Sequence, residues 1–286
     1  MEVISLHIDV ISRSKGRSAI QMAAYCARDK LYSDYTGKFY DYTNRQDLVY
    51  HDIMLPDYAP DDFHNSEVLW NSVEKVEKSK NAQLARTVII ALPKELSHSS
   101  HIQMVRQYAQ EYFVQKGMCA DISIHDKGDG NPHAHMLLTT RSLDSDGKWM
   151  CKQRRNYLLD KYGDRIRDPV TRGYKLGRSI KTNDWDASER IEEWRKGWAE
   201  MCRSWFRRCG ISKEITHISY ARQGIDREPT IHLGAKVRSL EDRGLVTDRG
   251  TRSRDIQARN HQHDRMILRE YIEKDRERGL DCDRYI

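Results

Sequence analysis

Apolar and polar residues alternate in several short segments of the chain, a pattern typical of β-strands with one buried face. Residues 4–11, ISLHIDVI, alternate in this way and predict a strand. Residues 86–92, RTVIIAL, contain a strongly β-branched run and predict a core strand. A further strand is expected at 49–54. The aromatic-rich stretch LYSDYTGKFYDYT predicts a hairpin that turns at Thr36 and Gly37.

Helical patterns separate these strands. Ser18 and Gln21 have the spacing of a capping box, which predicts a helix from about Ala19 to Lys30. Three more helices are expected, from Asp61 or Asp62 to about Ser79, from Leu96 to Lys116 before Gly117, and over 186–209. The last of these places large apolar residues on one stripe, which indicates core packing: Ile191, Trp194, Trp198, Met201 and Trp205.

The order of these elements predicts the fold class. Helices alternate with strands, and the short hairpins force antiparallel pairing, so we expect an α+β fold with a mostly antiparallel central sheet flanked by helices. Residues 141–184 are basic and predicted to be loop-like. From Gly234 onward the chain is Arg-rich and predicted to be helical. We therefore expect a main domain over 1–209 and a helical C-terminal part over 210–286, either packed on that domain or beginning a longer helical region.

The composition predicts a soluble, very polar protein. Of 286 residues, 38% are hydrophobic and 32% are charged, and no apolar run approaches the length that spans a bilayer. The amino-terminal segment lacks a signal-peptide pattern, so we expect a cytoplasmic protein without membrane insertion. Six cysteines form no CxxC pair, which favours reduced thiols over a disulfide framework.

Positive charge is concentrated in one segment. The net charge is +6, but residues 141–181 alone carry twelve Lys or Arg against five Asp, interleaved with tyrosines and a tryptophan. Cations neutralise phosphates and aromatic rings stack on unpaired bases, so this mixture suits single-stranded nucleic acid. Arg154 and Arg155 are candidate DNA contacts. The alternative is a solvated, flexible loop, since charge runs often have no other role.

Three histidines are clustered in the segment ISIHDKGDGNPHAHMLLTT. His133 and His135 are two residues apart, so on a strand they share one face. The Gly-, Asp- and Pro-rich turn before them predicts an antiparallel hairpin that brings His125 close to both. Three neutral imidazoles would make a divalent-metal site with open coordination positions, as in catalytic sites. The alternative is a chance cluster among twelve histidines.

A histidine-ligated metal in a basic, aromatic protein points to phosphodiester chemistry. Among fifteen tyrosines, Tyr25 has a distinctive setting, because it is predicted on a short helix after a loop with three cations. Arg13, Lys15 and Arg17 could hold a phosphate backbone while the phenol faces the phosphorus. The alternative is that Tyr25 is a half-buried aromatic of an ordinary helix.

Several segments in the same order resemble the MobA/MobL-type (MobQ class) conjugative relaxases, a branch of the HUH endonucleases. They span most of residues 4–260. The first is HIDVISRSKGRSAIQMAAYCARDKLYSDYTGKFYDYT, similar to the family's nucleophile region. The others are LWNSVEKVEKSKNAQLARTVIIALPKELS, ADISIHDKGDGNPHAHMLLTTR and EITHISYARQGIDREPTIHLG, of which the second resembles the family's metal motif.

The resemblance implies an HUH/Rep-like relaxase fold in which Tyr25 is the catalytic tyrosine. It also implies that His125, His133 and His135 bind Mg²⁺ or Mn²⁺. The expected function is plasmid mobilisation, by site- and strand-specific nicking of DNA at a transfer origin through a 5′-phosphotyrosyl intermediate, followed by rejoining. Expected partners are single-stranded or hairpin DNA at that origin, accessory relaxosome proteins and a coupling protein.

The sequence departs from the family at one position. Many relatives carry a glutamate after the Ala-Arg pair at 85 and 86, where this chain has Thr87. Asp126 is a candidate for orienting the metal-binding histidines from behind, since metal-bound histidines usually donate their other N–H to a carboxylate or carbonyl.

Three other kinds of protein would share parts of the pattern. A rolling-circle replication initiator or a transposase of the HUH class would use the same tyrosine chemistry, but the order of tyrosine first and histidines later favours a relaxase. A non-catalytic, metal-stabilised DNA-binding module would nick nothing. A metal-dependent hydrolase using activated water would leave free 5′-phosphate ends.

Overall fold

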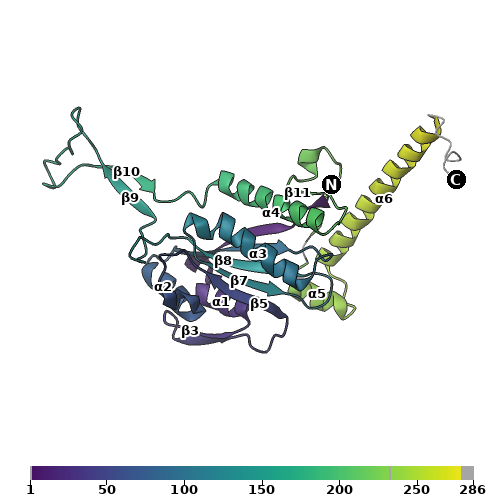
Figure 1. The fold of residues 1–286 in the computed structure, drawn as a ribbon, viewed down its shortest axis with the longest axis horizontal. Coiled ribbons are helices and arrows are strands. Elements are labelled where there is room, and N and C mark those ends of the chain that lie inside the picture. Colours follow the sequence, from purple (N-terminus) through teal and green to yellow (C-terminus); the bar gives the residue numbers. More distant parts are fainter. Residues whose placement is uncertain (1, 232, 278–286) are drawn as a thin grey trace. The chain divides into compact units, whose positions relative to one another are not determined.

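A five-stranded sheet is the centre of the computed structural model, which describes residues 2–231 and 233–277 (Figure 1). The chain forms two compact units, Met1–His217 and Ile218–Ile286. In the first unit every neighbouring pair of strands in this sheet is antiparallel. The strand order is β2 (Leu6–Ser12), β6 (Gln83–Ala91), β8 (His133–Thr139), β7 (Ala120–His125) and β5 (Leu48–Met54). The α+β prediction is confirmed.

One face of the sheet is covered by α3 (His98–Tyr112) and α4 (Ser188–Arg208), as Figure 1 shows. Val88 and Ile90 of β6 point to this face and are fully buried. The tryptophans of α4 join the same core, so the predicted apolar stripe is a packing surface. Its burial stabilises the helix far more than intrinsic propensity does.

The other face is covered by α1 (Ala19–Ala27) and α2 (Ser66–Val76). Three alanines of α1 have no exposed surface, which lets this short helix approach the sheet closely. Leu137 of β8 points into this second core. The predicted hairpin is present as β3 (Lys30–Ser33) and β4 (Lys38–Asp41), with Gly37 at φ 65° in its turn.

Three helix boundaries differ from the sequence prediction. Helix α1 ends at Ala27 rather than Lys30, because Arg28 takes a left-handed conformation with φ 55°. Asn65 caps α2, accepting hydrogen bonds from two backbone N–H groups, whereas the predicted start at Asp61 or Asp62 lies in a 3₁₀ turn (Asp61–His64). Helix α3 ends at Tyr112, before a 3₁₀ turn (Val114–Lys116) and Gly117 at φ 92°.

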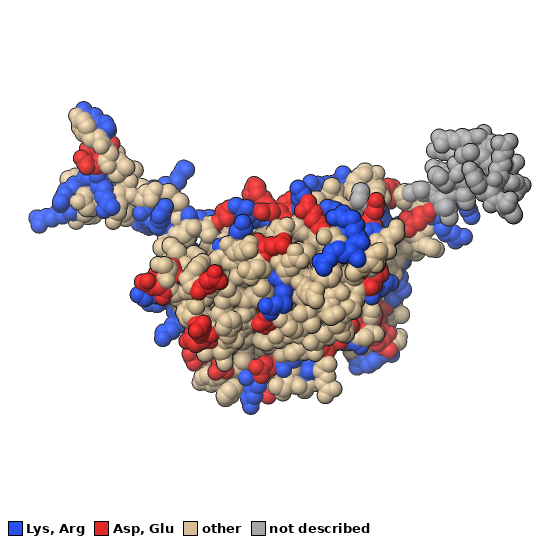
Figure 2. All heavy atoms as spheres, in the orientation of Figure 1, with Lys and Arg blue, Asp and Glu red and all other residues tan. Residues whose placement is uncertain are grey.

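The segment predicted to be loop-like contains a β-hairpin. Strands β9 (Gln153–Tyr157) and β10 (Leu176–Lys181) pair antiparallel and carry the chain away from the sheet (Figure 1). We call residues 153–181 the arm. All five residues of β9 are exposed, so no buried face imposed the alternation from which a strand is recognised. Lys and Arg side chains gather on the arm in Figure 2.

Several shorter elements lie outside the central sheet. In the first unit, β1 (Glu2–Val3) pairs in parallel with β11 (Ile215–Thr216), and Arg13–Lys15 form a 3₁₀ turn. The second unit contains a 3₁₀ turn (Ala221–Gln223), α5 (Ala235–Asp242) and α6 (Asp248–Glu277), so its predicted helical character is confirmed. Among the described helices, none combines the length and the apolar run needed to cross a membrane.

Candidate active site and metal centre

The three histidines of the predicted hairpin converge on one point. In the β7–β8 pair, His125 lies directly opposite His133. His135 is two residues further along β8 and points to the same face, the side covered by α1. One ring nitrogen from each histidine can be chosen so that all three atoms lie within 4.8 Å of one another. This spacing is compatible with a single metal ion.

Hydrogen bonds to backbone carbonyl oxygens indicate which ring nitrogens of His125 and His133 carry the proton. His125 Nε2 lies 2.6 Å from the carbonyl oxygen of Cys26, and His133 Nδ1 lies 2.9 Å from that of Asn131. If both nitrogens donate, the other nitrogen of each ring keeps its lone pair. Both ring nitrogens of His135 are buried without a hydrogen-bond partner among the described residues. A metal ion would satisfy one of them, so the donor set fits such an ion.

Burial keeps two of these imidazoles, those of His125 and His135, neutral at physiological pH. Desolvation, with a smaller contribution from the nearby Arg28 cation, lowers the pKa of His125 to about 4. Desolvation together with the other two histidines lowers the pKa of His135 to about 3. Because only the neutral imidazole can bind a metal, these two histidines are available to a cation at pH 7.

Helix α1 places the Tyr25 ring beside the histidine cluster. The ring centroid lies 6.1 Å from that of His135 and 6.5 Å from that of His125. Tyr25 also lines a hollow of about 280 Å³ together with Arg17 and Tyr42. The structure therefore brings together the four residues that the sequence and the family resemblance singled out for chemistry.

Arg28 and Asp47 join this group, and the sequence analysis missed both. Arg28 forms two hydrogen bonds of 2.7 and 2.9 Å with the Asp47 carboxylate, and both side chains are almost completely buried. The Arg28 pairing lowers the pKa of Asp47 to about 2. The same guanidinium donates to the Tyr25 carbonyl oxygen, lies 4.4 Å from the Tyr25 ring centroid and is 3.2 Å from His125 Nδ1.

This arrangement links the tyrosine to the candidate metal-binding residue His125 through one cation. Arg28 donates to the nitrogen of His125 that faces away from Cys26, so a metal ion at the cluster would compete for that lone pair. Arg28 follows Tyr25 by three residues, a spacing that could have been noticed in the sequence. Asp47 has no comparable local signal, because it follows β4 and lies 19 residues from Arg28 in the sequence.

The three predicted loop cations have different environments. Arg17 lines the hollow at Tyr25 and forms an ion pair with Asp9. Lys15 is exposed on the 3₁₀ turn. Arg13 instead donates to the carbonyl oxygens of Glu74, Glu77 and Ser79, at the end of α2 and just after it. The structure thus places Arg17, but not Arg13, at the tyrosine.

The remaining residues that the sequence analysis named are Asp126, Thr87, Arg154 and Arg155. Asp126 Oδ2 lies 2.8 Å from His98 Nε2, and Oδ1 accepts a hydrogen bond from the Gly128 N–H. In the described chain, none of its hydrogen bonds goes to the histidine cluster. Thr87 pairs with Asp9 across β2 and β6, and its hydroxyl lies 3.4 Å from the Asp9 carbonyl oxygen. Arg154 and Arg155 are exposed on β9.

A glutamate of α2 holds the start of the tyrosine helix. Glu74 Oε1 accepts hydrogen bonds from Ser18 Oγ at 2.8 Å and from the Ala19 backbone N–H at 2.7 Å. Ser18 Oγ accepts from the Gln21 N–H, as the capping pattern predicted. The Gln21 side chain does not return to the cap; its amide donates to Tyr42 Oη.

Comparisons with known proteins identify the family of this chain. The family model described as the MobA/MobL family matches residues 17–243. The chain is 32% identical over 274 residues to a probable mobilization protein MobA of Bifidobacterium longum. The alignment covers 91% of this chain and 48% of that protein. It is 34% identical to the conjugal transfer protein TraA of Agrobacterium fabrum, covering 84% of this chain and 22% of that protein.

A solved structure is also similar. The chain in the structure described as "Molecular Basis of Vancomycin Resistance Transfer in Staphylococcus aureus" matches with a TM-score of 0.64 and 31% sequence identity. The match covers 76% of this chain and all of that one. The chain spans less than half the length of the two relatives above. From the family match, the relatives and the shared fold, this chain belongs to the MobA/MobL family of relaxases.

Proposed function

We propose that this chain nicks one DNA strand at a plasmid transfer origin and later rejoins it, with Tyr25 as the nucleophile. The observation that carries the proposal is the position of the Tyr25 ring, 6.1 Å from His135 and open to a hollow that Arg17 also lines. Membership of the MobA/MobL family supports the same activity.

In the proposed reaction, Tyr25 Oη attacks the phosphorus of one phosphodiester. The new bond joins Oη to phosphorus, and the bond from phosphorus to the 3′ oxygen of the upstream nucleotide breaks. The phenol loses its proton and the departing 3′ oxygen takes one up. The product is a 5′-phosphotyrosyl linkage. Because one phosphoester replaces another, a free 3′ hydroxyl can reverse the step without ATP.

The surrounding side chains stabilise charge in this reaction. The Arg28 and Arg45 guanidinium groups lie 4.4 and 5.0 Å from the Tyr25 ring centroid, so negative charge on the phenolic oxygen has two nearby cations. Arg17 is positioned to contact a phosphate entering the hollow. His125, His133 and His135 would hold a divalent cation, which would polarise the phosphate oxygens as a Lewis acid.

The donor set favours Mn²⁺ over Mg²⁺ as that cation. The cluster offers three imidazole nitrogens and includes no carboxylate from the described residues. Mg²⁺ prefers oxygen ligands, whereas transition metals bind imidazole more tightly. We expect Mn²⁺ to support the reaction at a lower concentration than Mg²⁺.

The proposed substrate is single-stranded or hairpin DNA, held in part by the arm. The exposed strands of the arm carry Arg154 and Arg155 among many cations, and Tyr157 and Tyr174 present partly exposed rings. Accessory relaxosome proteins and a coupling protein belong to the same proposal, as partners of the complete relaxase.

The test is covalent trapping. The protein is incubated with a panel of single-stranded origin oligonucleotides and Mn²⁺, and a denaturing gel is read for a protein–DNA adduct. Tyr25→Phe should abolish the adduct while leaving oligonucleotide binding nearly unchanged, because it removes only the attacking oxygen.

Tyr42→Phe is the matched control, since the Tyr42 ring lies 5.5 Å from Tyr25 in the same hollow. It should still form the adduct. An adduct that survives Tyr25→Phe, or that is lost only with Tyr42→Phe, would show that Tyr25 is not the nucleophile. Free 5′-phosphate ends without an adduct would instead indicate a hydrolase.

A further inference from the structure

A second cavity lies well away from the histidine cluster. It has a volume of about 650 Å³ and is formed where β6, β8, the root of the arm and the start of α4 meet. Thr139 lines it, six residues along β8 from His133, which corresponds to about 20 Å of strand. Its volume lies in the range of small-molecule sites.

A buried cation that forms no ion pair with the described carboxylates is part of its wall. Arg86 is 7% exposed and alternates with Val88 and Ile90 on the face of β6 covered by α3 and α4. Its guanidinium donates to the Trp185 carbonyl oxygen and lies 5.6 Å from the Trp194 ring. Its Nε is buried without a hydrogen-bond partner among the described residues. Asp186 attracts this guanidinium electrostatically without forming a direct ion pair with it, and a buried cation with incomplete hydrogen bonding is costly.

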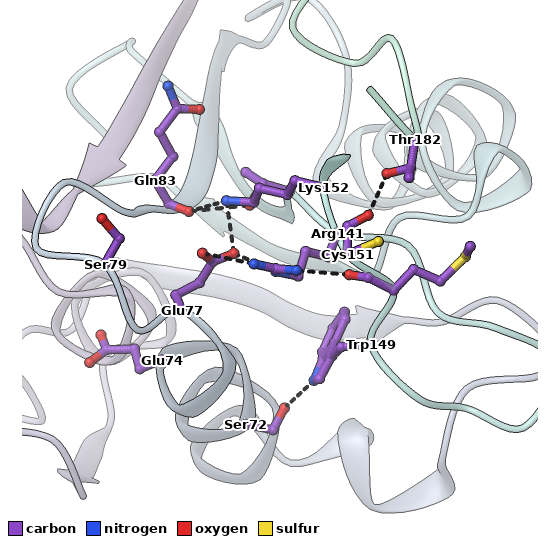
Figure 3. A network of polar contacts seen from close by, with 12 residues as sticks. Ser72, Glu74, Glu77, Ser79, Gln83, Arg141, Trp149, Cys151, Lys152 and Thr182 are labelled. Carbon is purple, nitrogen blue, oxygen red and sulfur yellow. Dashed lines mark hydrogen bonds and ion pairs between the residues drawn. The ribbon is translucent and has the colours of Figure 1, made fainter. Parts of the chain in front are cut away.

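The carboxylates nearby are already paired with other cations. Glu77 accepts from Arg141 Nε at 2.7 Å and from Lys152 Nζ at 2.8 Å, as Figure 3 shows. Asp186 Oδ2 lies 2.7 Å from Lys181 Nζ. Glu77 is therefore paired with two cations, Arg141 and Lys152, and Asp186 is paired with Lys181. With Arg86 added, the cavity wall has an excess of positive charge.

We propose that this cavity binds a phosphate group carried by a nucleotide, with Arg86 as its principal ligand. A phosphate accepts several hydrogen bonds from a guanidinium and would be a direct ion-pair partner for Arg86. Lys152 and Arg141 lie on the same wall and add attraction. Trp185 and Trp194 also line the cavity, whose remaining space is large enough for a nucleoside. The nucleotide is either free or part of a DNA strand that enters beside the arm.

Cys151 provides a way to detect occupancy. It is a free, exposed cysteine that lines the cavity. Cys209, at the far end of α4, is also free and exposed but does not line it, so it is the internal control. The protein is treated with N-ethylmaleimide in the presence of inorganic phosphate, thymidine 5′-phosphate, thymidine or an oligothymidylate. Peptide mass spectrometry then measures the rate at which each thiol is alkylated.

We expect the phosphate-bearing ligands to slow alkylation of Cys151 several-fold and to leave Cys209 unchanged, whereas thymidine has no effect. Protection by inorganic phosphate and thymidine 5′-phosphate would identify a site for free nucleotides. Protection by the oligothymidylate alone, if it depends on Arg86, would assign the site to a DNA strand. No protection by any phosphate-bearing ligand, or equal protection by thymidine, would overturn the proposal.

Arg86→Gln removes the charge and leaves a shorter polar side chain. It should raise the ligand concentration needed for half-protection by at least about tenfold, since it removes a charged hydrogen bond. Oligonucleotide protection that persists unchanged in Arg86→Gln would mean that the arm merely covers Cys151, and the proposal would fail. If Arg86→Gln does not fold, Arg86→Lys and the wild-type comparison with thymidine give the answer. None of these measurements requires DNA cleavage, so they are independent of the Tyr25 test.

Discussion

At the scale of single residues, Arg28 connects the tyrosine helix to the histidine cluster. Its ion pair with Asp47 is buried, with side-chain exposures of 3% and 8%. Removing one partner of a buried pair leaves the other charge uncompensated, and this typically costs about 3–5 kcal/mol of stability. The left-handed backbone at Arg28 is stabilised by these contacts.

Arg28→Met should therefore lower the free energy of unfolding by about 3–5 kcal/mol, measured by urea denaturation. Arg17→Met is the matched control, because the pair of Arg17 and Asp9 is 30% and 39% exposed and such surface pairs contribute about 0–1 kcal/mol. Equal losses of stability in the two variants would show that the buried Arg28 pair contributes no more to the free energy of unfolding than the exposed Arg17 pair.

The buried imidazoles make stability depend on pH. The pKa values of about 4 for His125 and about 3 for His135 lie below the ordinary value of 6.5. Above pH 6.5 both are neutral in the folded and unfolded chain. As the pH falls below 6.5, the unfolded chain takes up protons that the folded chain does not, until the folded pKa is reached.

The free energy of unfolding should therefore fall by roughly 2 kcal/mol for each of these histidines between pH 7 and pH 5. Urea denaturation in EDTA at both pH values measures this loss. His135→Gln should show a smaller loss than the wild-type protein. An identical loss in both proteins would assign the pH dependence to other groups.

At the scale of elements, α1 is held at both ends by groups from elsewhere in the chain. Glu74 of α2 caps its first turn, and the bond from Arg28 to the Tyr25 carbonyl oxygen closes its last. Such caps orient a short helix that has few hydrogen bonds of its own. The direction of the tyrosine therefore depends on α2.

Glu74→Ala should lower the free energy of unfolding by about 1–3 kcal/mol, because it leaves buried N–H groups without an acceptor. It should also slow adduct formation at saturating oligonucleotide while leaving the affinity for the oligonucleotide nearly unchanged. Lys75→Ala, at the exposed neighbouring position, is the control and should change neither quantity. A loss of affinity without a loss of rate would argue against a positioning role.

The sequence predicted those elements whose signals are local. The spacing of His125, His133 and His135 and the turn between them were sufficient to predict the β7–β8 hairpin, because register follows from strand alternation. Asp47 was missed because its partner Arg28 is distant along the chain and no pattern couples the two. The sequence singled out the charge of the arm but not its hairpin, because β9 has no buried face. Asn65 displaced the expected caps at Asp61 and Asp62 because a 3₁₀ turn intervenes.

At the scale of the whole molecule, the arm adds charge without contributing to the core. Residues 154–180 contain eight Lys or Arg against three Asp, and β9 is exposed throughout. Gln153 and Lys181 are Cα partners at its root, so a two-residue turn can join them. The arm can thus be removed while the pairing at its base is kept.

Replacing residues 154–180 with Asn-Gly should leave the thermal unfolding midpoint nearly unchanged. It should weaken binding of single-stranded DNA and flatten the dependence of log affinity on log salt by about 0.7 for each phosphate that the arm neutralises. Fluorescence anisotropy at several salt concentrations measures both effects. An unchanged salt slope would show that the arm does not contact the DNA backbone.

The histidines and the tyrosine are mounted on elements of unequal rigidity. Strand β8 is hydrogen-bonded to β6 on one edge and to β7 on the other, so His133 and His135 belong to the stiffest part of the sheet. Tyr25 belongs to a helix of nine residues. In the proposed strand-transfer reaction, the histidine cluster would therefore stay fixed, and Tyr25 would be the group that moves away with the attached DNA and returns for rejoining.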